Sequence, residues 1–395
     1  MSFIISTDTS ANLPDEYINR NSLLVIPFSY FENGKKKQCL SIDSFDGDAF
    51  YAGLKNLDVK TSMINVSEYC DAWRPVLEQG NDILHISMSS GISGAYQAAA
   101  NSAGILSEEF PDRQIKVFDS RAASLGEGMM VMQAVKALKS GADIDEAFDF
   151  LYKMRENLHQ LFTVDDLFHL RRGGRVTTGA AVFGTVLNIK PILTSDEEGR
   201  IILCGKARGR IASVKYLAFE MLEAPGPDLS EIIGIAYAGC EKDAKALARL
   251  IKQSAPTASI MTVCYEPVTG SHVGNGAVAL FYFSEKAGES SAPPAFKTAF
   301  EQKAKNTPVA AKTAAAIART SEVMSKLHEK TSEYKHELQK QASRAIVRAT
   351  HQGEKTSIII RDTCSLGGEN ESYDGQKLPE NAADSSVNTG NVKED

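Results

Sequence analysis

The sequence predicts an α/β fold in which two α/β domains with mainly parallel sheets precede a helical and disordered C-terminal tail. The first observation is length, because 395 residues are enough for two domains and an additional segment. The second is the alternation of short apolar strands with helical segments, which is typical of parallel sheets covered by helices on both faces. The third is a change of composition after Phe283. We therefore predict domains over residues 1–158 and 159–284 and a tail over residues 285–395.

The composition excludes several classes of function. Hydrophobic residues make up 43% of the chain and charged residues 24%, which are ordinary globular values. The net charge of −7 argues against nucleic acid as a partner. No apolar run is long enough for an integral membrane segment, and the first residues lack the features of a signal peptide. The six cysteines form no C-x-x-C pair, so we expect a reduced, cytoplasmic protein without a zinc site.

The N-terminal half begins with a buried strand, Phe3-Ile4-Ile5, followed by polar residues. Asp8 among them either binds a ligand or metal or caps a turn. Asn33-Gly34, between two strand-like runs, is a strong hairpin signal. Apolar residues at helical spacing, such as Ile144, Phe148 and Leu151, predict helices. The predicted helices cover residues 45–54, 67–78, 95–106, 126–138 and 143–158, and further strands cover residues 83–86 and 115–118.

A run of serines and glycines from Ser89 to Gln97 joins a predicted strand to a predicted helix. Glycine lets the backbone approach a ligand closely, and a helix start offers N–H donors and a positive dipole end to an anion. This predicts an anion site whose hydroxyl ligand is Ser93. The alternative is that Ser90 or Ser93 only caps the helix. Thr61 and Ser120 also follow strand-like runs, so they could converge with Ser93 at the carboxyl ends of the strands.

The second half carries two further candidate features. Arg171, Arg172 and Arg175 flank a Gly-Gly turn, and this cationic group either binds phosphate or an acidic partner or is a solvated turn. His272 lies in a glycine-rich stretch, residues 270–276, which we predict to be a loop. The predicted strands cover residues 161–164, 189–193, 200–203, 232–236, 260–265 and 277–283, and the predicted helices cover residues 177–187, 211–222 and 241–253.

The tail differs in kind from the rest of the chain. A linker over residues 290–294 leads to Thr307-Pro308, which is a good helix start because proline suits the first helical position. The helix predicted from there to about Gln352 has only a thin apolar stripe, so it either pairs with a partner or stays solvated. From Thr363 onward, polar and acidic residues predict disorder.

Known catalytic motifs are incomplete or missing. Gly91-Ile92-Ser93-Gly94-Ala95 lacks the last glycine of the nucleophile elbow of a serine hydrolase. A hydrolase acting on a lipid or acyl ester, with Ser93 as nucleophile and His272 as base, stays open as an alternative. The phosphate-binding and dinucleotide-binding glycine motifs are absent, so we predict no catalytic residue, metal or cofactor.

Six short motifs occur along the chain, and their order is specific although no single one of them is. They are Thr7-Asp8-Thr9-Ser10, Lys60-Thr61-Ser62, Ser89 to Gln97, Phe118-Asp119-Ser120 with Gly126-Glu127-Gly128, Leu170 to Val176, and Gly270 to Gly274. Through them the chain resembles, up to about Phe283, the DegV family, which includes the fatty-acid-binding subunit of bacterial fatty acid kinase. It differs from the usual family pattern after Ser62, where Met63-Ile64-Asn65 stand in place of a proline and a serine.

The resemblance implies a binding protein rather than an enzyme. It implies one buried long-chain fatty acid, whose carboxyl group a separate kinase catalytic subunit converts to an acyl phosphate. The matching ligand-binding residues are Thr61, Ser62, Ser93, Gly94 and His272, and Arg171, Arg172 and Arg175 match the ligand mouth and partner surface. A regulatory or scaffold protein that acts through its C-terminal helix is a further alternative.

Overall fold

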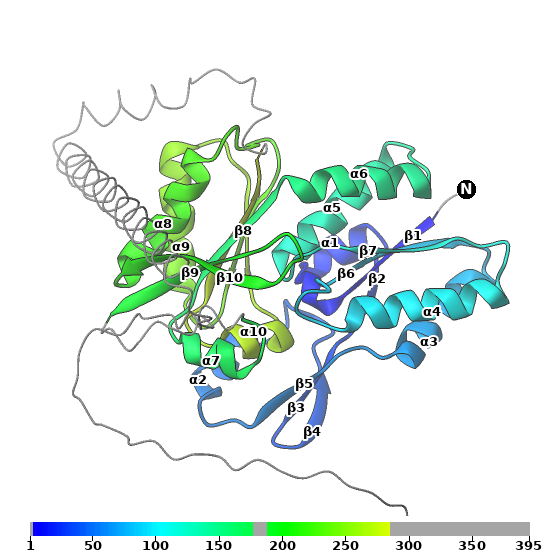
Figure 1. Cartoon of the computed structure of the whole chain (residues 1–395), viewed down its shortest axis with the longest axis horizontal. Coiled ribbons are helices and arrows are strands. Elements are labelled where there is room, and N and C mark those ends of the chain that lie inside the picture. The colour runs from blue at the N-terminus through cyan, green and yellow to red at the C-terminus, as the bar shows by residue number, and fades with distance from the viewer. Residues whose placement is uncertain (1–2, 177–187, 285–395) are drawn as a thin grey trace, which may run out of the picture. The chain divides into compact units, whose positions relative to one another are not determined.

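The structure, a computed structural model, describes residues 3–176 and 188–284 (Figure 1). The predicted helix over residues 177–187 and the whole predicted tail lie outside these residues. Strands and helices alternate along the described chain, which confirms the α/β class. All strands of one larger sheet come before residue 158, and all strands of the other come from residue 158 onward. The division into two domains at that point stays a prediction.

The first sheet is parallel throughout, as the sequence predicts. Its four strands follow the order β2-β1-β6-β7, and every neighbouring pair is parallel. All residues of β6 are buried, which is typical of a strand covered on both faces. The strands are β1 (Phe3–Asp8), β2 (Leu24–Ile26), β6 (Asp82–Ser87) and β7 (Ile115–Asp119).

Helices cover both faces of this sheet. α3 packs against α4, and α5 packs against α6 (Figure 1). α3 and α6 each begin with a capping box, in which Asn65 or Asp143 exchanges hydrogen bonds with a glutamate three residues later. The sequence did not predict α1 or the 3₁₀ turn η1. The elements are η1 (Thr9–Ala11), α1 (Asp15–Arg20), α3 (Val66–Glu78), α4 (Ala95–Glu109), α5 (Leu125–Lys139) and α6 (Ile144–Glu156).

A small antiparallel sheet of three strands, in the order β4-β3-β5, holds the predicted hairpin. Asn33 and Gly34 have φ values of 50° and 80°, which a tight hairpin turn requires. β5 pairs with β3 so that Thr61 lies opposite Tyr30. This pairing fixes the position of two predicted site residues. The elements are β3 (Ser29–Glu32), β4 (Lys35–Gln38), α2 (Gly47–Gly53) and β5 (Val59–Ser62).

The second sheet differs from the mainly parallel arrangement predicted for it. Its six strands follow the order β10-β9-β8-β13-β11-β12, and only β11 and β12 pair in parallel. The tight turn from Asp196 to Arg200 joins β9 to β10, and such a short connection permits only an antiparallel pair. α8 (Arg210–Glu223) and α9 (Glu241–Ser254) pack on this sheet. The strands are β8 (Leu158–Thr163), β9 (Ile189–Ser195), β10 (Ile201–Arg208), β11 (Ile233–Tyr237), β12 (Ile260–Cys264) and β13 (Val278–Phe283).

Two short helices stand where the sequence predicted irregular structure. α7 (Leu167–Arg172) precedes the Gly-Gly turn, and α10 (Pro267–Val273) replaces most of the predicted loop over residues 270–276. Glu266 caps α10 by accepting hydrogen bonds from the N–H groups of Val268 and Thr269, and Pro267 occupies the first turn. The Glu266-Pro267 pair is a sequence signal for the start of this helix. The glycines that follow the pair favour a loop instead.

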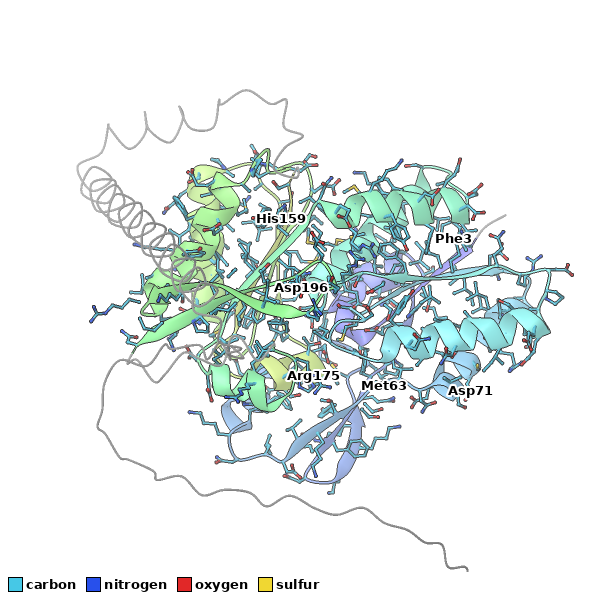
Figure 2. The ribbon with its side chains drawn as sticks, in the orientation of Figure 1. Phe3, Met63, Asp71, His159, Arg175 and Asp196 are labelled. Atoms are coloured by element: carbon cyan, nitrogen blue, oxygen red, sulfur yellow. The ribbon has the colours of Figure 1, made fainter. Side chains whose placement is uncertain are left out.

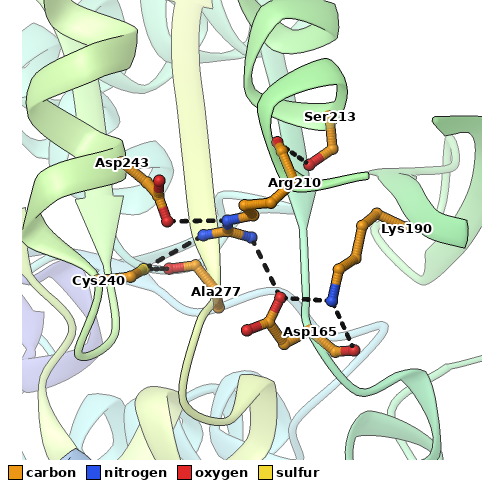
Figure 3. A network of polar contacts seen from close by, with 7 residues as sticks. All are labelled: Asp165, Lys190, Arg210, Ser213, Cys240, Asp243 and Ala277. Atoms are coloured by element: carbon orange, nitrogen blue, oxygen red, sulfur yellow. Dashed lines mark hydrogen bonds and ion pairs between the residues drawn. The ribbon is translucent and has the colours of Figure 1, made fainter. Parts of the chain in front are cut away.

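A polar network holds the chain before α7 in place (Figure 3). Arg210, at the start of α8, donates to Asp243 of α9 at 2.9 Å and lies 3.7 Å from the carboxylate of Asp165. Lys190 of β9 donates to Asp165 at 2.7 Å. Asp165 therefore joins α8 and β9 to the segment that leads into α7.

α5 lies against both larger sheets. A Cβ atom on Gly126 would lie 2.9 Å from Cδ1 of Phe281 in β13, and one on Gly128 would collide with the carbonyl oxygen of Ala11. Gly234 of β11 lies in the same way against Leu125. Glycine at Gly126 and Gly128 permits a close approach that a Cβ atom would prevent without a shift of the neighbouring atoms.

A buried pair of carboxyl groups joins α5 to β1. Asp8 accepts from the N–H groups of Ser10 at 2.8 Å and Met88 at 3.3 Å, so it caps η1, as one of its two sequence interpretations held. Glu127 accepts from the hydroxyls of Thr7 and Ser10. Burial raises the pKa of Asp8 to about 6, and burial together with the charge of Asp8 raises the pKa of Glu127.

We predict that Glu127→Gln raises the melting temperature at neutral pH. The pKa of Glu127 is higher in the folded than in the unfolded state, so its contribution to stability is present below about pH 4.5 and is lost as the pH rises through the folded pKa. Glutamine keeps the shape and cannot ionise. Thermal unfolding from acidic to neutral pH, with exposed Glu108→Gln as the control, tests this. Parallel profiles for wild type and Glu127→Gln would contradict it.

Candidate functional site

A cavity of about 840 Å³ lies where the first sheet, the small sheet and the second sheet face one another. This volume is within the usual range for small-molecule sites. Its apolar lining residues come from several elements and include Phe28, Met88, Phe162, Val268 and Phe281. The cavity is therefore suited to a ligand with a large apolar part.

Most of the predicted site residues line this cavity. Thr61 and Ser62 come from β5, Ser93 and Gly94 from the start of α4, and His272 from the last turn of α10. Oγ1 of Thr61 lies 2.9 Å from Nε2 of His272, at hydrogen-bond distance. We call this group the polar rim, because Ser62 and Gly94 are exposed to solvent and the other three are half-buried.

Ser93 directly precedes Gly94, the N-cap residue of α4, and its role as a ligand stays a prediction. Its Oγ accepts a hydrogen bond from the N–H of Ala95 at 3.2 Å, so it satisfies a donor at the start of α4. It also lines the cavity. Gly94 lies against Met63, since a Cβ there would be 2.7 Å from the methionine sulfur. Met63 is half-exposed beside the rim (Figure 2).

His272 is neutral at neutral pH. Burial, helped by the positive charge of Arg175 and by the nearby His169, lowers its pKa to about 4. A neutral imidazole has one donor and one acceptor nitrogen, so Thr61 and His272 can exchange a single hydrogen bond without any buried charge. The ring also lies against Gly173, where a Cβ would be 2.9 Å from Nδ1.

The structure describes the side chains of two of the three predicted arginines, Arg171 and Arg175. Arg175 is half-buried in the cavity wall, where its guanidinium donates to the carbonyl oxygen of Gly173 and burial lowers its pKa. Arg171 is exposed and does not line the cavity. Arg172 ends α7, and its side chain lies outside what the structure describes. Arg171 and Arg172 thus lie at the end of α7, whereas Arg175 follows the Gly-Gly turn.

The turn between β9 and β10 closes one side of the cavity. Oγ of Ser89 donates to the carbonyl oxygen of Gly199 at 2.8 Å. Gly199 has a φ of 75°, and a side chain there would collide with Ser89. The loop that carries Ser93 is thus held by a turn that begins at Asp196 (Figure 2).

Several cavity residues were not predicted from the sequence. Nε2 of Gln160 donates to the carbonyl oxygen of Arg121 at 2.8 Å and to Oγ of Ser195 at 2.9 Å, and all three residues line the cavity. Ser124, just before α5, lines it as well. Ser120, which the sequence placed with Thr61 and Ser93, is instead turned away, and its hydroxyl donates to the carbonyl oxygen of Ser87.

The hydrogen bonds do not form a catalytic pair. Within the described residues, His272 bonds to Thr61, whereas Ser93 Oγ accepts from a backbone N–H. A nucleophile needs a base within hydrogen-bond reach. In the same part of the chain, no group of three His, Cys, Asp or Glu side chains is placed to hold a metal ion. Nor does a helix there have the length and apolar character to cross a membrane.

Comparisons with known proteins agree on one family. A family model described as an uncharacterised protein of the DegV family matches residues 2–285. A DegV domain-containing protein of Clostridium perfringens is 33% identical over 72% of this chain and 98% of its own length. A solved structure described as fatty acid binding of a DegV family protein from Thermus thermophilus has a TM-score of 0.62 at 27% identity, covering 72% of this chain and all of that one. A fatty acid binding DegV family protein from Streptococcus agalactiae has a TM-score of 0.62 at 28% identity, with the same coverage.

We predict that His272 makes the protein less stable as the pH falls. Its pKa is lower in the folded than in the unfolded state, so the unfolded chain takes up a proton between about pH 6.5 and 4 that the folded chain excludes. In His272→Gln, chemical unfolding over this range should show a weaker loss of stability. Thr61→Val, which removes only the hydrogen-bond partner, should keep the wild-type trend. Equal slopes in wild type and His272→Gln would exclude this role.

Proposed function

The chain belongs to the DegV family, and on that premise we propose that it binds one long-chain fatty acid, with the carboxyl group at the polar rim and the acyl chain in the apolar cavity. The observation that carries this proposal is a large apolar cavity with hydroxyl and imidazole groups gathered at its exposed end. The relatives from Thermus thermophilus and Streptococcus agalactiae, which this chain covers in full, are described as fatty acid binding.

The proposed binding divides between the two parts of the ligand. Each buried CH₂ group contributes about 0.8 kcal/mol, so a long acyl chain supplies most of the affinity. The carboxyl group is then held by Thr61, Ser93 and His272, all uncharged at neutral pH. The start of α4 adds its positive dipole end. The carboxylate held in this way forms no close ion pair with an arginine.

We further propose that the protein presents the carboxyl group to a separate kinase. Ser62 and Met63 are exposed at the rim, so an incoming enzyme can reach a carboxyl oxygen there. A fatty acid kinase catalytic subunit in the cytoplasm would transfer the phosphoryl group and form the acyl phosphate. This chain would supply binding and orientation and no catalytic residue. Arg171, exposed beside the Gly-Gly turn, is the proposed contact with that partner.

We predict that the purified protein releases a long-chain fatty acid on organic extraction, detected by mass spectrometry. Combining Thr61→Val with Ser93→Ala should weaken fatty acid binding about a hundredfold or more, because two hydrogen bonds to a charged group are lost and each contributes about 1.5–3 kcal/mol. Ser67→Ala is a suitable control, since Ser67 is exposed on α3, does not line the cavity and donates its hydroxyl to Asp71. Repeated absence of lipid, with no binding in titration, would refute the proposed function.

The partner contact has its own test. Arg171→Glu should slow acyl phosphate formation by the added kinase subunit about tenfold while leaving fatty acid affinity unchanged, since reversal of an exposed charge acts on association with the partner. Arg20→Glu, an exposed arginine on α1, controls for the change in net charge. Equal rates for Arg171→Glu and wild type would remove Arg171 from the interface.

A further inference from the structure

Ser124 combines a strained backbone with an unpaired hydroxyl in the cavity wall. Its φ of 54° and ψ of −142° form a conformation that residues other than glycine rarely adopt. The residue is only 1% exposed, and within the described chain its Oγ has no hydrogen-bond partner. Buried hydroxyl groups normally have partners, and strain of this kind persists where function requires it. These two features point to a ligand contact.

Ser124 belongs to the buried part of the cavity wall, which we call the cavity floor, and not to the polar rim. The next two residues, Leu125 and Gly126, pack against Gly234 of β11 and Phe281 of β13. Ala122 and Phe281, which line the cavity with Ser124, are also buried. The rim residues, in contrast, are exposed or half-buried. A ligand whose carboxyl group lies at the rim would therefore pass Ser124 with an interior part of its chain.

The position of Ser124 at the N-terminus of α5 strengthens its hydroxyl as a hydrogen-bond donor. Ser124 is the N-cap residue of α5, a helix of 15 residues, yet its side chain makes no capping hydrogen bond. Glu127, the acidic residue in the first turn, directs its carboxyl group to Thr7 and Ser10. The cavity side of this helix start thus keeps its positive dipole end and a free hydroxyl, which favour an electron-rich oxygen atom.

The same geometry does not make Ser124 a nucleophile. A serine with positive φ between a strand and a helix resembles the nucleophile elbow of hydrolases. Such a serine needs a base within hydrogen-bond reach, and none of the residues described in the structure forms a hydrogen bond with its Oγ. Ser124 is therefore placed to bind a ligand atom without covalent chemistry.

We propose that the hydroxyl of Ser124 binds an oxygen atom carried along the acyl chain, so that the preferred ligands are oxygenated long-chain fatty acids, with a hydroxyl or keto group in the chain interior. This inference rests on the proposed fatty acid binding. A plain hydrocarbon chain would leave Ser124 unpaired, whereas a hydroxyl or keto oxygen at the matching carbon pairs with it. The cavity floor would then select the ligand by its functional group, and the rim would select it by its carboxyl group.

The test compares stearic acid with a series of hydroxystearic acids that carry the hydroxyl at different interior carbons. In titrations of the full-length protein, one positional isomer should bind about tenfold more tightly than stearic acid, the value of one well-placed hydrogen bond. Ser124→Ala and Ser124→Gly should both remove this preference while retaining stearic acid binding. The glycine variant also relieves the backbone strain, so it folds even if the alanine variant does not.

Ser213→Ala provides the matched control, because Ser213 is equally buried but lies in α8 outside the cavity lining, and its hydroxyl donates to the carbonyl oxygen of Arg210. This variant should keep the preference. Equal binding of stearic acid and every isomer by wild type, or a preference that survives in both Ser124 variants, would overturn the inference and leave fatty acid binding intact. Failure of all these acids to bind would instead overturn the proposed function. Labelling of Ser124 by a fluorophosphonate probe would show a nucleophile and also overturn the inference.

Discussion

The close packing of α5 against both larger sheets is the constraint on which the rest of the structure depends. A Cβ atom on Gly126 or Gly128 of the helix would lie within 3.0 Å of the Phe281 ring or the Ala11 carbonyl oxygen, and one on Gly234 of β11 would lie 3.2 Å from Leu125 and Met129. Because α5 begins at the cavity floor, this packing also fixes how far the two sheets stand apart there. The packing of α5 therefore contributes both to the stability of the fold and to the shape of the cavity.

Burial shifts the protonation of polar groups both in the cavity wall and behind it. The low pKa of His272 leaves its imidazole neutral in the wall, and burial raises the pKa values of Asp8 and Glu127, which do not line the cavity. A cavity with few fixed charges suits a ligand that is mainly hydrocarbon, since burying unpaired charge beside an acyl chain is costly. Arg175, half-buried in the wall, is the exception, and a backbone carbonyl holds it.

The sequence predicted those parts of the fold and site that depend on local patterns. The parallel strands β1, β6 and β7, the Asn33-Gly34 hairpin, and the position of Ser93 at a strand-to-helix junction follow from periodicity and turn chemistry. The antiparallel order of the second sheet depends on pairings between distant segments, which local patterns do not encode. α10 was missed because glycines normally disfavour a helix, and here Glu266 and tertiary packing outweigh them.

The unpredicted site residues have the same explanation. Gln160, Arg121 and Ser195 meet only because β8 and β9 lie beside the end of β7, so no motif in the sequence marks them. The resemblance to a family found Thr61 and His272, yet their hydrogen bond joins residues 211 positions apart and is visible only in three dimensions. Ser124 had a local signal, a serine directly before a helix, but neither its strain nor its unpaired hydroxyl can be read from residue type.

The turn between β9 and β10 limits the insertions and deletions that this chain can accept. Hairpin turns on a surface usually tolerate inserted or deleted residues. Here the turn carries Gly199, which bonds through its carbonyl oxygen to Ser89 and so supports the loop of Ser93. A change in the length of this hairpin would shift the ligand loop of the opposite sheet. We therefore expect the turn to behave under mutation as part of the binding site, despite its distance in sequence.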